Sequence, residues 1–186
     1  MNFKPKRIKE KLEASKSDPQ KLYKIAAFIV NGRWPAAEPY ILKNPGISYR
    51  YAEDVIKGRW PEAESIIMKD PHKAYLYAQN ILQKRWPEAE PYIIKDPVRA
   101  SLYAANVIKG RWPEAESIIM KNPEAAFYYA FYVIKGRWPE AEPYIMKDPK
   151  YILNYALEVL KRRWPEAENQ LKKDFNFWNF YNAKIL

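Results

Sequence analysis

Hydrophobic and polar positions along this chain follow a pattern that recurs every 26 residues. In residues 70–95, the apolar positions are spaced at i, i+3, i+4, i+7 and i+8, and they are Ala74, Tyr77, Ala78, Ile81 and Leu82. This is the period of an amphipathic helix, and it predicts a first helix from about residue 71 to residue 83. A second helix is predicted from Pro87 to about Lys95, with an inner face made of Ala89, Tyr92 and Ile93.

Polar residues, prolines and glycines mark the ends of the first helix. Each repeat opens with Asp or Asn followed by Pro, as in Asp70–Pro71, a pair that is typical of a helix start. Four of the six repeats place Gly near the end of the first helix, which predicts a left-handed residue there: Gly32, Gly58, Gly110 and Gly136. Lys84 and Arg162 take that place in the other two repeats, at an expected cost of about 1 kcal/mol each.

The most regular feature is a Trp preceded by Arg and followed by Pro, at positions 34, 60, 86, 112, 138 and 164. A fixed period of this length predicts a stacked repeat array. We therefore expect an all-α fold, an α-solenoid of six helix-turn-helix repeats at 18–43, 44–69, 70–95, 96–121, 122–147 and 148–173.

The two ends of the chain depart from the repeat. Residues 1–17 predict a short amphipathic helix carrying Ile8 and Leu12, which would cap the first repeat; a mobile basic arm is the alternative. Residues 174–186 match the first helix of a seventh repeat, with Asp174 as the cap residue and Tyr181 in the place of Tyr77. The segment predicts a C-terminal half-repeat cap.

The string KGRWPEAEPYIMKDP at residues 135–149 resembles tandem-repeat proteins encoded by bacteriophages and some bacteria, over residues 18–173. The helical hairpins are more distantly similar to tetratricopeptide and Sel1-like repeats, whose consensus signatures are absent. The resemblance implies a helical array in a phage context. A host protein, including a defence component, or another phage protein would then be the partner, in the cytoplasm of the host cell. It implies no activity and no site residues.

Composition and motifs argue against catalysis and against a cofactor or metal. There is no Cys and one His, His72, so a thiolate site, a zinc site or a His-based triad lacks parts. No Gly-rich phosphate loop or nucleophile motif occurs. The Arg–Glu sets, such as Arg85 with Glu88 and Glu90, recur in nearly every repeat, and we interpret them as ion pairs between repeats that also compensate helix ends. The longest apolar run, 25–30, is too short for a membrane span, so a cytoplasmic protein is expected.

Two features raise nucleic-acid binding as an alternative. The Trp ladder could stack on bases, although its recurrence at one position favours a structural spine. The net charge is +10, but the four central repeats carry only +2 of it. A protein that follows phosphates along the array would carry the excess in every repeat. Binding would therefore use the ends, through Lys4, Lys6, Arg7, Lys9 and Lys11 with Lys150, Arg162, Arg163, Lys172 and Lys173.

The informative positions are those that differ between repeats, the third, seventh, tenth and eleventh. In the second repeat they are polar or small, whereas in the fifth they are Glu124, Tyr128, Phe131 and Tyr132. A predicted solvent face that turns apolar indicates an interaction site. We expect non-catalytic protein binding, with self-association as a further alternative, through Leu76, Leu102, Tyr128, Phe131, Tyr132 and Leu157.

Overall fold

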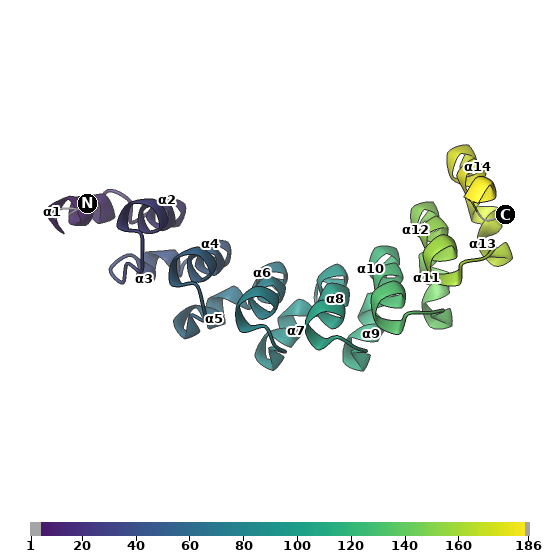
Figure 1. The fold of residues 1–186 in the computed structure, drawn as a ribbon, viewed down its shortest axis with the longest axis horizontal. Coiled ribbons are helices and arrows are strands. Elements are labelled where there is room, and N and C mark those ends of the chain that lie inside the picture. Colours follow the sequence, from purple (N-terminus) through teal and green to yellow (C-terminus); the bar gives the residue numbers. More distant parts are fainter. Residues whose placement is uncertain (1–4, 185–186) are drawn as a thin grey trace. The chain divides into compact units, whose positions relative to one another are not determined.

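A computed structural model describes residues 5–184, which form helices joined by short turns with no strand in that range. The chain divides into two compact units, Met1–Ile93 and Ile94–Leu186. Within each unit the first helices of the repeats lie side by side in one layer, and the second helices form the other layer (Figure 1). The expected all-α array of helical hairpins is confirmed.

The first unit contains α1 (Pro5–Glu13) and three repeats. The first helices are α2 (Pro19–Ile25), α4 (Pro45–Arg50) and α6 (Pro71–Leu76). Each continues into a π-helical segment, and these segments are Ala26–Val30, Tyr51–Ile56 and Tyr77–Leu82. The second helices are α3 (Glu38–Ile41), α5 (Pro61–Ile67) and α7 (Glu90–Ile93), and α7 follows the 3₁₀ turn Pro87–Ala89.

The second unit repeats this plan and adds a last helix. Its first helices are α8 (Pro97–Tyr103), α10 (Pro123–Tyr128) and α12 (Pro149–Asn154). Their π-helical segments are Ala104–Ile108, Tyr129–Ile134 and Tyr155–Leu160. The second helices are α9 (Pro113–Ile119), α11 (Glu142–Ile145) after the 3₁₀ turn Pro139–Ala141, and α13 (Pro165–Leu171), and the chain continues into α14 (Phe175–Lys184).

The predicted helix starts are confirmed by their hydrogen bonds. The Asp70 Oδ1 atom accepts from the backbone N–H of Lys73 at 3.0 Å, and Pro71 occupies the first helical position. The same cap is formed by Asp18, Asn44, Asp96, Asn122, Asp148 and Asp174. These side chains satisfy first-turn N–H groups that have no partner within the helix.

The end of the first helix corrects the prediction made for glycine. None of the glycines has a positive φ; the left-handed residue is the one before, namely Asn31, Lys57, Gln83, Lys109, Lys135 and Lys161. The π-helical segment is the cause, because its turns are wider than α-helical ones. The Ala52 carbonyl accepts from Lys57 and Gly58, five and six residues on, so the chain reverses at Lys57. The cost predicted for Lys84 and Arg162 is therefore wrong, since neither residue has a positive φ.

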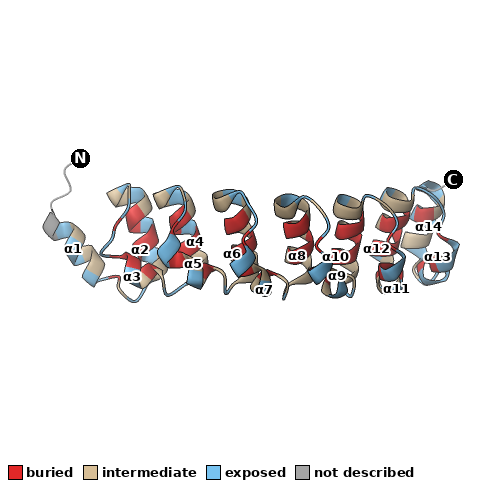
Figure 2. Ribbon diagram, turned by 90° about the horizontal axis from the view of Figure 1, so that it is seen from below, coloured by how far each residue is buried: buried red, intermediate tan, exposed pale blue. Residues whose placement is uncertain are grey.

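The π-helical segment also alters the predicted core stripe. Ala74, Tyr77 and Ala78 are fully buried as expected, as are Ala89 and Ile93 of the second helix. Ile81, Leu82 and Tyr92 are only half-buried, whereas Tyr75 is buried and was not predicted. A wider turn rotates the later residues away from the face that a 3.6-residue period assigns to them. Buried residues occupy the packed sides of both helices (Figure 2).

The second helix carries Pro-Tyr-Ile in the first, third and fifth repeats and Ser-Ile-Ile in the second and fourth, and this alternation has a structural counterpart. Where Ser65 or Ser117 stands, the second helix is continuous from the Pro after Trp, as in α5 and α9. Where Pro91 or Pro143 stands, the first turn is 3₁₀ and the α-helix begins at the preceding Glu. Proline lacks the N–H that would continue the α-helical hydrogen bonds across that turn.

Both terminal segments form the helices that were predicted. In α1, Ile8 and Leu12 are half-buried, and the Lys16 ammonium that follows lies 5.7 Å from the centre of the Tyr40 ring. In α14, Tyr181 is fully buried, and its hydroxyl accepts from the Trp164 N–H at 2.6 Å. Residues 1–4, 185 and 186 lie outside the described residues; Ile185 and Leu186, which match Ile81 and Leu82 of the repeat in sequence, are among them.

Candidate interaction surface

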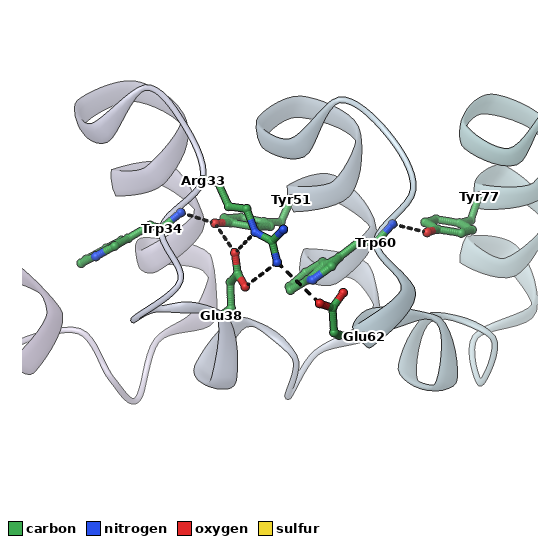
Figure 3. Close-up of polar contacts among 7 residues, drawn as sticks. All are labelled: Arg33, Trp34, Glu38, Tyr51, Trp60, Glu62 and Tyr77. Carbon is green, nitrogen blue, oxygen red and sulfur yellow. Dashed lines mark hydrogen bonds and ion pairs between the residues drawn. The ribbon is translucent and has the colours of Figure 1, made fainter.

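The joint between neighbouring repeats is a hydrogen-bonded network that begins at the Trp backbone. The N–H of Trp34 donates to the Tyr51 hydroxyl at 2.6 Å, and that hydroxyl donates to Glu38 Oε1 at 3.2 Å (Figure 3). Arg33 holds the same carboxylate through Nε at 2.7 Å and Nη2 at 3.1 Å. Tyr51 comes from the following repeat, so the network joins two repeats.

The same network recurs along both units. The Trp N–H to Tyr hydroxyl bonds measure 2.7 Å for Trp60–Tyr77, 2.7 Å for Trp112–Tyr129, 2.7 Å for Trp138–Tyr155 and 2.6 Å for Trp164–Tyr181. The first repeat has Ile25 at the tyrosine position, and residues 1–17 before it contain no Trp. The hydroxyl is thus placed where a preceding Trp N–H needs an acceptor.

Burial raises the pKa of the joint tyrosines. Tyr51 and Tyr77 are fully buried, and desolvation raises the pKa of each to about 12. The neighbouring carboxylate acts in the same direction, because a negative charge disfavours tyrosinate. The hydroxyl therefore stays protonated and can donate to Glu while accepting from Trp.

The Arg–Glu pairs correct part of the interpretation made from sequence. Each Arg bonds the second Glu of its own repeat, as in Arg59–Glu64 at 2.7 Å and Arg85–Glu90 at 2.6 Å. The expected pair between repeats is seen for Arg33 and Glu62, at 3.7 Å. The Arg and the Glu are five residues apart, so the Arg before the Trp reaches the Glu in the first turn of the second helix. The carboxylate also accepts from Tyr, so it completes a joint.

The Trp ladder is a structural spine, as the sequence favoured. All six indoles are buried, and Trp60 is only 1% exposed. Each of several indoles lies against the tyrosine of its own repeat, with ring centres 5.0 Å apart for Tyr51–Trp60 and 5.1 Å apart for Tyr155–Trp164. Buried rings in this arrangement cannot stack on nucleic-acid bases.

The predicted aromatic surface is formed in the second unit. Phe131 and Tyr132 meet edge to face with ring centres 4.7 Å apart, and Tyr128 lies 6.1 Å from Tyr132. Tyr132 is 51% exposed, and Tyr128 and Phe131 are half-buried. We call Tyr128, Phe131 and Tyr132 the aromatic patch. A partly exposed cluster of large rings is characteristic of binding surfaces.

Phe127 supports this patch and was missed by the sequence argument. Its buried ring stacks on Phe131 at 5.9 Å and lies 6.1 Å from Tyr151 of the next repeat. The signal was present, because the sixth position holds an aromatic residue in several repeats. The predicted stripe included the fifth and the eighth positions but not the sixth.

The other predicted surface residues are divided between the units. Leu102 on α8 and Leu157 in the π-helical segment after α12 belong to the second unit with the patch, and both are half-buried. Leu76 on α6 belongs to the first unit and is also half-buried. The row predicted from Leu76 through Leu102 to Tyr128 therefore starts in one unit and continues in the other.

In the second and third repeats several of the equivalent positions are polar and paired, whereas the first repeat has Phe28, 77% exposed, at the position of Tyr132. The Tyr23 hydroxyl donates to Asp54 Oδ2 at 2.5 Å. Tyr49 donates to Glu53, and the Asn80 amide donates to Tyr49 at 2.9 Å and to Glu53 at 3.3 Å. Side chains that bond one another across repeats are less available to a partner, so the second and third repeats present a different face from the fifth.

The basic residues of the nucleic-acid alternative are partly used within the chain. Arg163 bonds Glu168 at 2.7 Å and lies 5.5 Å from the Tyr181 ring, and Lys172 lies over Trp178 at 4.9 Å. Arg162 is exposed, as are Arg7 and Lys9 of α1, and Lys11 is half-buried. Lys4 and the side chain of Lys6 lie outside the described residues.

Among the described residues, no three or more His, Cys, Asp or Glu side chains gather as metal ligands would. No helix in that part of the chain has the length and apolar character needed to cross a membrane. Comparison with protein-family models, with curated proteins and with solved structures returned no match to this chain.

Proposed function

We propose that this protein is a non-catalytic scaffold that binds another protein through the first-helix face of its second unit. The observation that carries the proposal is the clustering of three large rings at the variable positions of the fifth repeat. In the second and third repeats Glu53, Asp54 and Asn80 at these positions bond tyrosines, whereas the fifth presents the aromatic patch with Tyr132 half exposed. Large rings bury much surface on binding at a low entropy cost, and they dominate many interfaces.

The resemblance to phage-encoded tandem repeats gives the proposal its context. The partner would be a host protein, including a defence component, or another phage protein. It would bind the face of the array that carries the aromatic patch. The repeated carboxylates support the non-catalytic part of the proposal. Glu64 is held by Arg59 and accepts from Tyr77, and this arrangement recurs in other joints.

Substitutions on the patch test this function. Tyr128→Ala and Tyr132→Ala should weaken capture of the partner by about 2 kcal/mol or more while leaving the melting temperature nearly unchanged, because their rings are partly exposed. Leu102→Asp should act in the same direction. Lys24→Ala is the matched control, since Lys24 is exposed and holds the register position of Tyr128 in the first repeat.

The measurement is affinity capture from the native host cell with and without nuclease, followed by titration of the captured protein. Equal capture by the parent and the patch variants would contradict the proposal. Loss of capture on nuclease treatment would favour the basic ends, and recovery of the chain itself as the sole captured protein would favour self-association.

A further inference from the structure

A cleft opens beside the aromatic patch, at the carboxyl ends of two neighbouring first helices. Its volume is about 290 Å³. The fifth repeat contributes Phe131, Lys135 and Gly136, and the sixth contributes Glu158, Val159 and Lys161. Phe131 and Val159 supply apolar walls, and a side chain added at Gly136 would meet nothing within 4 Å, so this side of the cleft is open. The cleft is large enough for one apolar side chain.

The rim of this cleft is basic. Lys135 and Lys161 are exposed and share one backbone conformation, with φ of 57° and 51°. They outnumber the single acid in the lining, Glu158. Exposed Arg162 follows Lys161 and adds a further positive charge beside the cleft. The helix-end carbonyls offset this charge only partly, since that of Ala130 already accepts from Lys135 and Gly136.

The lysines form a series in the second unit. Lys109, Lys135 and Lys161 occupy one register position in successive repeats, all exposed and all left-handed. The first unit has Asn31, Lys57 and Gln83 at that position, so the series is complete only where the aromatic patch lies. Packed helices are about 10 Å apart, and an extended chain advances about 3.3 Å per residue. Acidic residues four apart on an extended segment lie on one face about 13 Å apart, so the long side chains of successive lysines can meet them, and the residue midway between the acids shares that face.

We propose that this cleft binds an extended acidic segment of a partner protein. An apolar side chain of the segment enters between Phe131 and Val159, and carboxylates on either side meet Lys135 and Lys161. The Glu158 carboxylate in the lining would repel an acidic residue at the centre of the cleft. The apolar residue therefore lies at the centre, between the two acids. The inference rests on the proposed protein-binding function and names the chemistry of the partner.

The test uses the full chain and fluorescent peptides of about eight residues, too short to hold a helix. One peptide carries a Leu with an acidic residue two positions before it and another two positions after it, a second has Gly in place of Leu, and a third has Lys in place of the acids. Anisotropy titrations should give saturable binding for the first peptide only. Its dissociation constant should rise about tenfold from low to physiological salt, since the contacts are exposed ion pairs.

Variants separate the cleft from general attraction to a basic protein. Lys135→Glu, Lys161→Glu and Phe131→Ala should each weaken the acidic Leu peptide about fivefold or more. Lys57→Glu is the matched control, because it has the same register and backbone conformation in the first unit, and it should change binding less than about twofold. Circular dichroism melts check that each variant is folded.

Three results would overturn the inference. They are absence of saturable binding by the acidic Leu peptide, equal binding by the Gly peptide, and an equal loss for Lys57→Glu. A single-stranded oligonucleotide of matched charge that binds the cleft more tightly than the peptide would also overturn it, in favour of nucleic acid. If the captured partner is lost with Tyr132→Ala but kept with Lys135→Glu, the proposed function stands and only the acidic-segment inference fails.

Discussion

At each joint within a unit, a tyrosine hydroxyl accepts from the backbone N–H of a tryptophan and donates to a glutamate. The N–H lies at a turn, outside the regular hydrogen bonds of either helix, and it is buried. A buried N–H without an acceptor costs about 1–3 kcal/mol. The joint therefore depends on the tyrosine hydroxyl, because the ring of a Phe could fill the same space but could not accept this hydrogen bond.

Tyr77→Phe tests this dependence. The variant keeps the ring against Trp86, at 5.2 Å between centres, but leaves the Trp60 N–H without its acceptor. Unfolding in urea should show a loss of about 1–3 kcal/mol, with an unchanged slope. Tyr132→Phe, on a half-exposed ring, should change stability by less than about 0.5 kcal/mol. Equal effects of the two changes would show that the joint hydroxyl is dispensable.

The left-handed residues supply a second residue-scale prediction. Lys109 has φ of 59°, a conformation that costs a residue with a side chain about 1 kcal/mol or more, and glycine almost nothing. Lys109→Gly should therefore stabilise the chain by about 0.5 kcal/mol, after the entropy cost of glycine in the unfolded chain. Gly110→Ala should be nearly neutral, because Gly110 lacks a positive φ and its added side chain meets nothing within 4 Å. Thermal melts of both variants test whether the left-handed residue is Lys109 or Gly110.

The repeat period and the caps made most of the fold predictable from sequence. Asp70–Pro71 marked a helix start, and the recurrence of Trp marked a buried spine; both were confirmed. The π-helical segments were not predictable in this way, because a 3.6-residue period assumes one helix type throughout. That assumption misplaced the left-handed residue by one. Phe127 lies in the α-helical part of its helix and was missed because the predicted stripe left out the sixth position. The aromatic patch was found because its residues differ between repeats, whereas the cleft depends on side-chain packing that no pattern encodes.

At the scale of elements, α14 completes the joint of the sixth repeat. The last full repeat presents the Trp164 N–H and the buried side chain of Leu171, and α14 supplies Tyr181 to the first and packs against α13. Trp178 stacks on Tyr181 at 5.8 Å and is covered by Arg163 and Lys172. The α14 helix thus completes the joint that begins at Trp164.

Deletion of residues 174–186 should therefore destabilise the sixth repeat first. The Trp164 N–H loses its acceptor and apolar surface of α12 and α13 becomes exposed, so aggregation is expected. Hydrogen exchange should show faster amide exchange in residues 148–173 than in residues 96–121. A truncated chain that stays monomeric and melts at the same temperature would show that α14 is not a cap.

For the whole molecule, the buried tyrosines determine the response to high pH. The pKa of Tyr51 and of Tyr77 is raised to about 12 in the folded state, against about 10 in an unfolded chain. The folded state holds its phenolic protons longer, so this contribution to stability is complete below about pH 10 and is lost as pH rises toward about 12.

We expect unfolding in this interval to be cooperative, with tyrosinate absorbance rising together with the loss of helical circular dichroism. Tyr77→Phe should make the transition less steep in pH, because one shifted group is removed. Tyrosinate absorbance that saturates well before helicity is lost would contradict the burial of these hydroxyls.

The bond between a Trp N–H and the Tyr seventeen residues later has a consequence for how such a gene can change. Gain or loss of one whole repeat inside a unit leaves every Trp followed by a Tyr at the same distance, so unequal recombination between copies yields chains whose joints are already complete. A change of any other length breaks the register. The number of repeats can therefore change while the fold is kept. The order of the first-helix faces can change as well, and each new order presents a different surface on the same helical array.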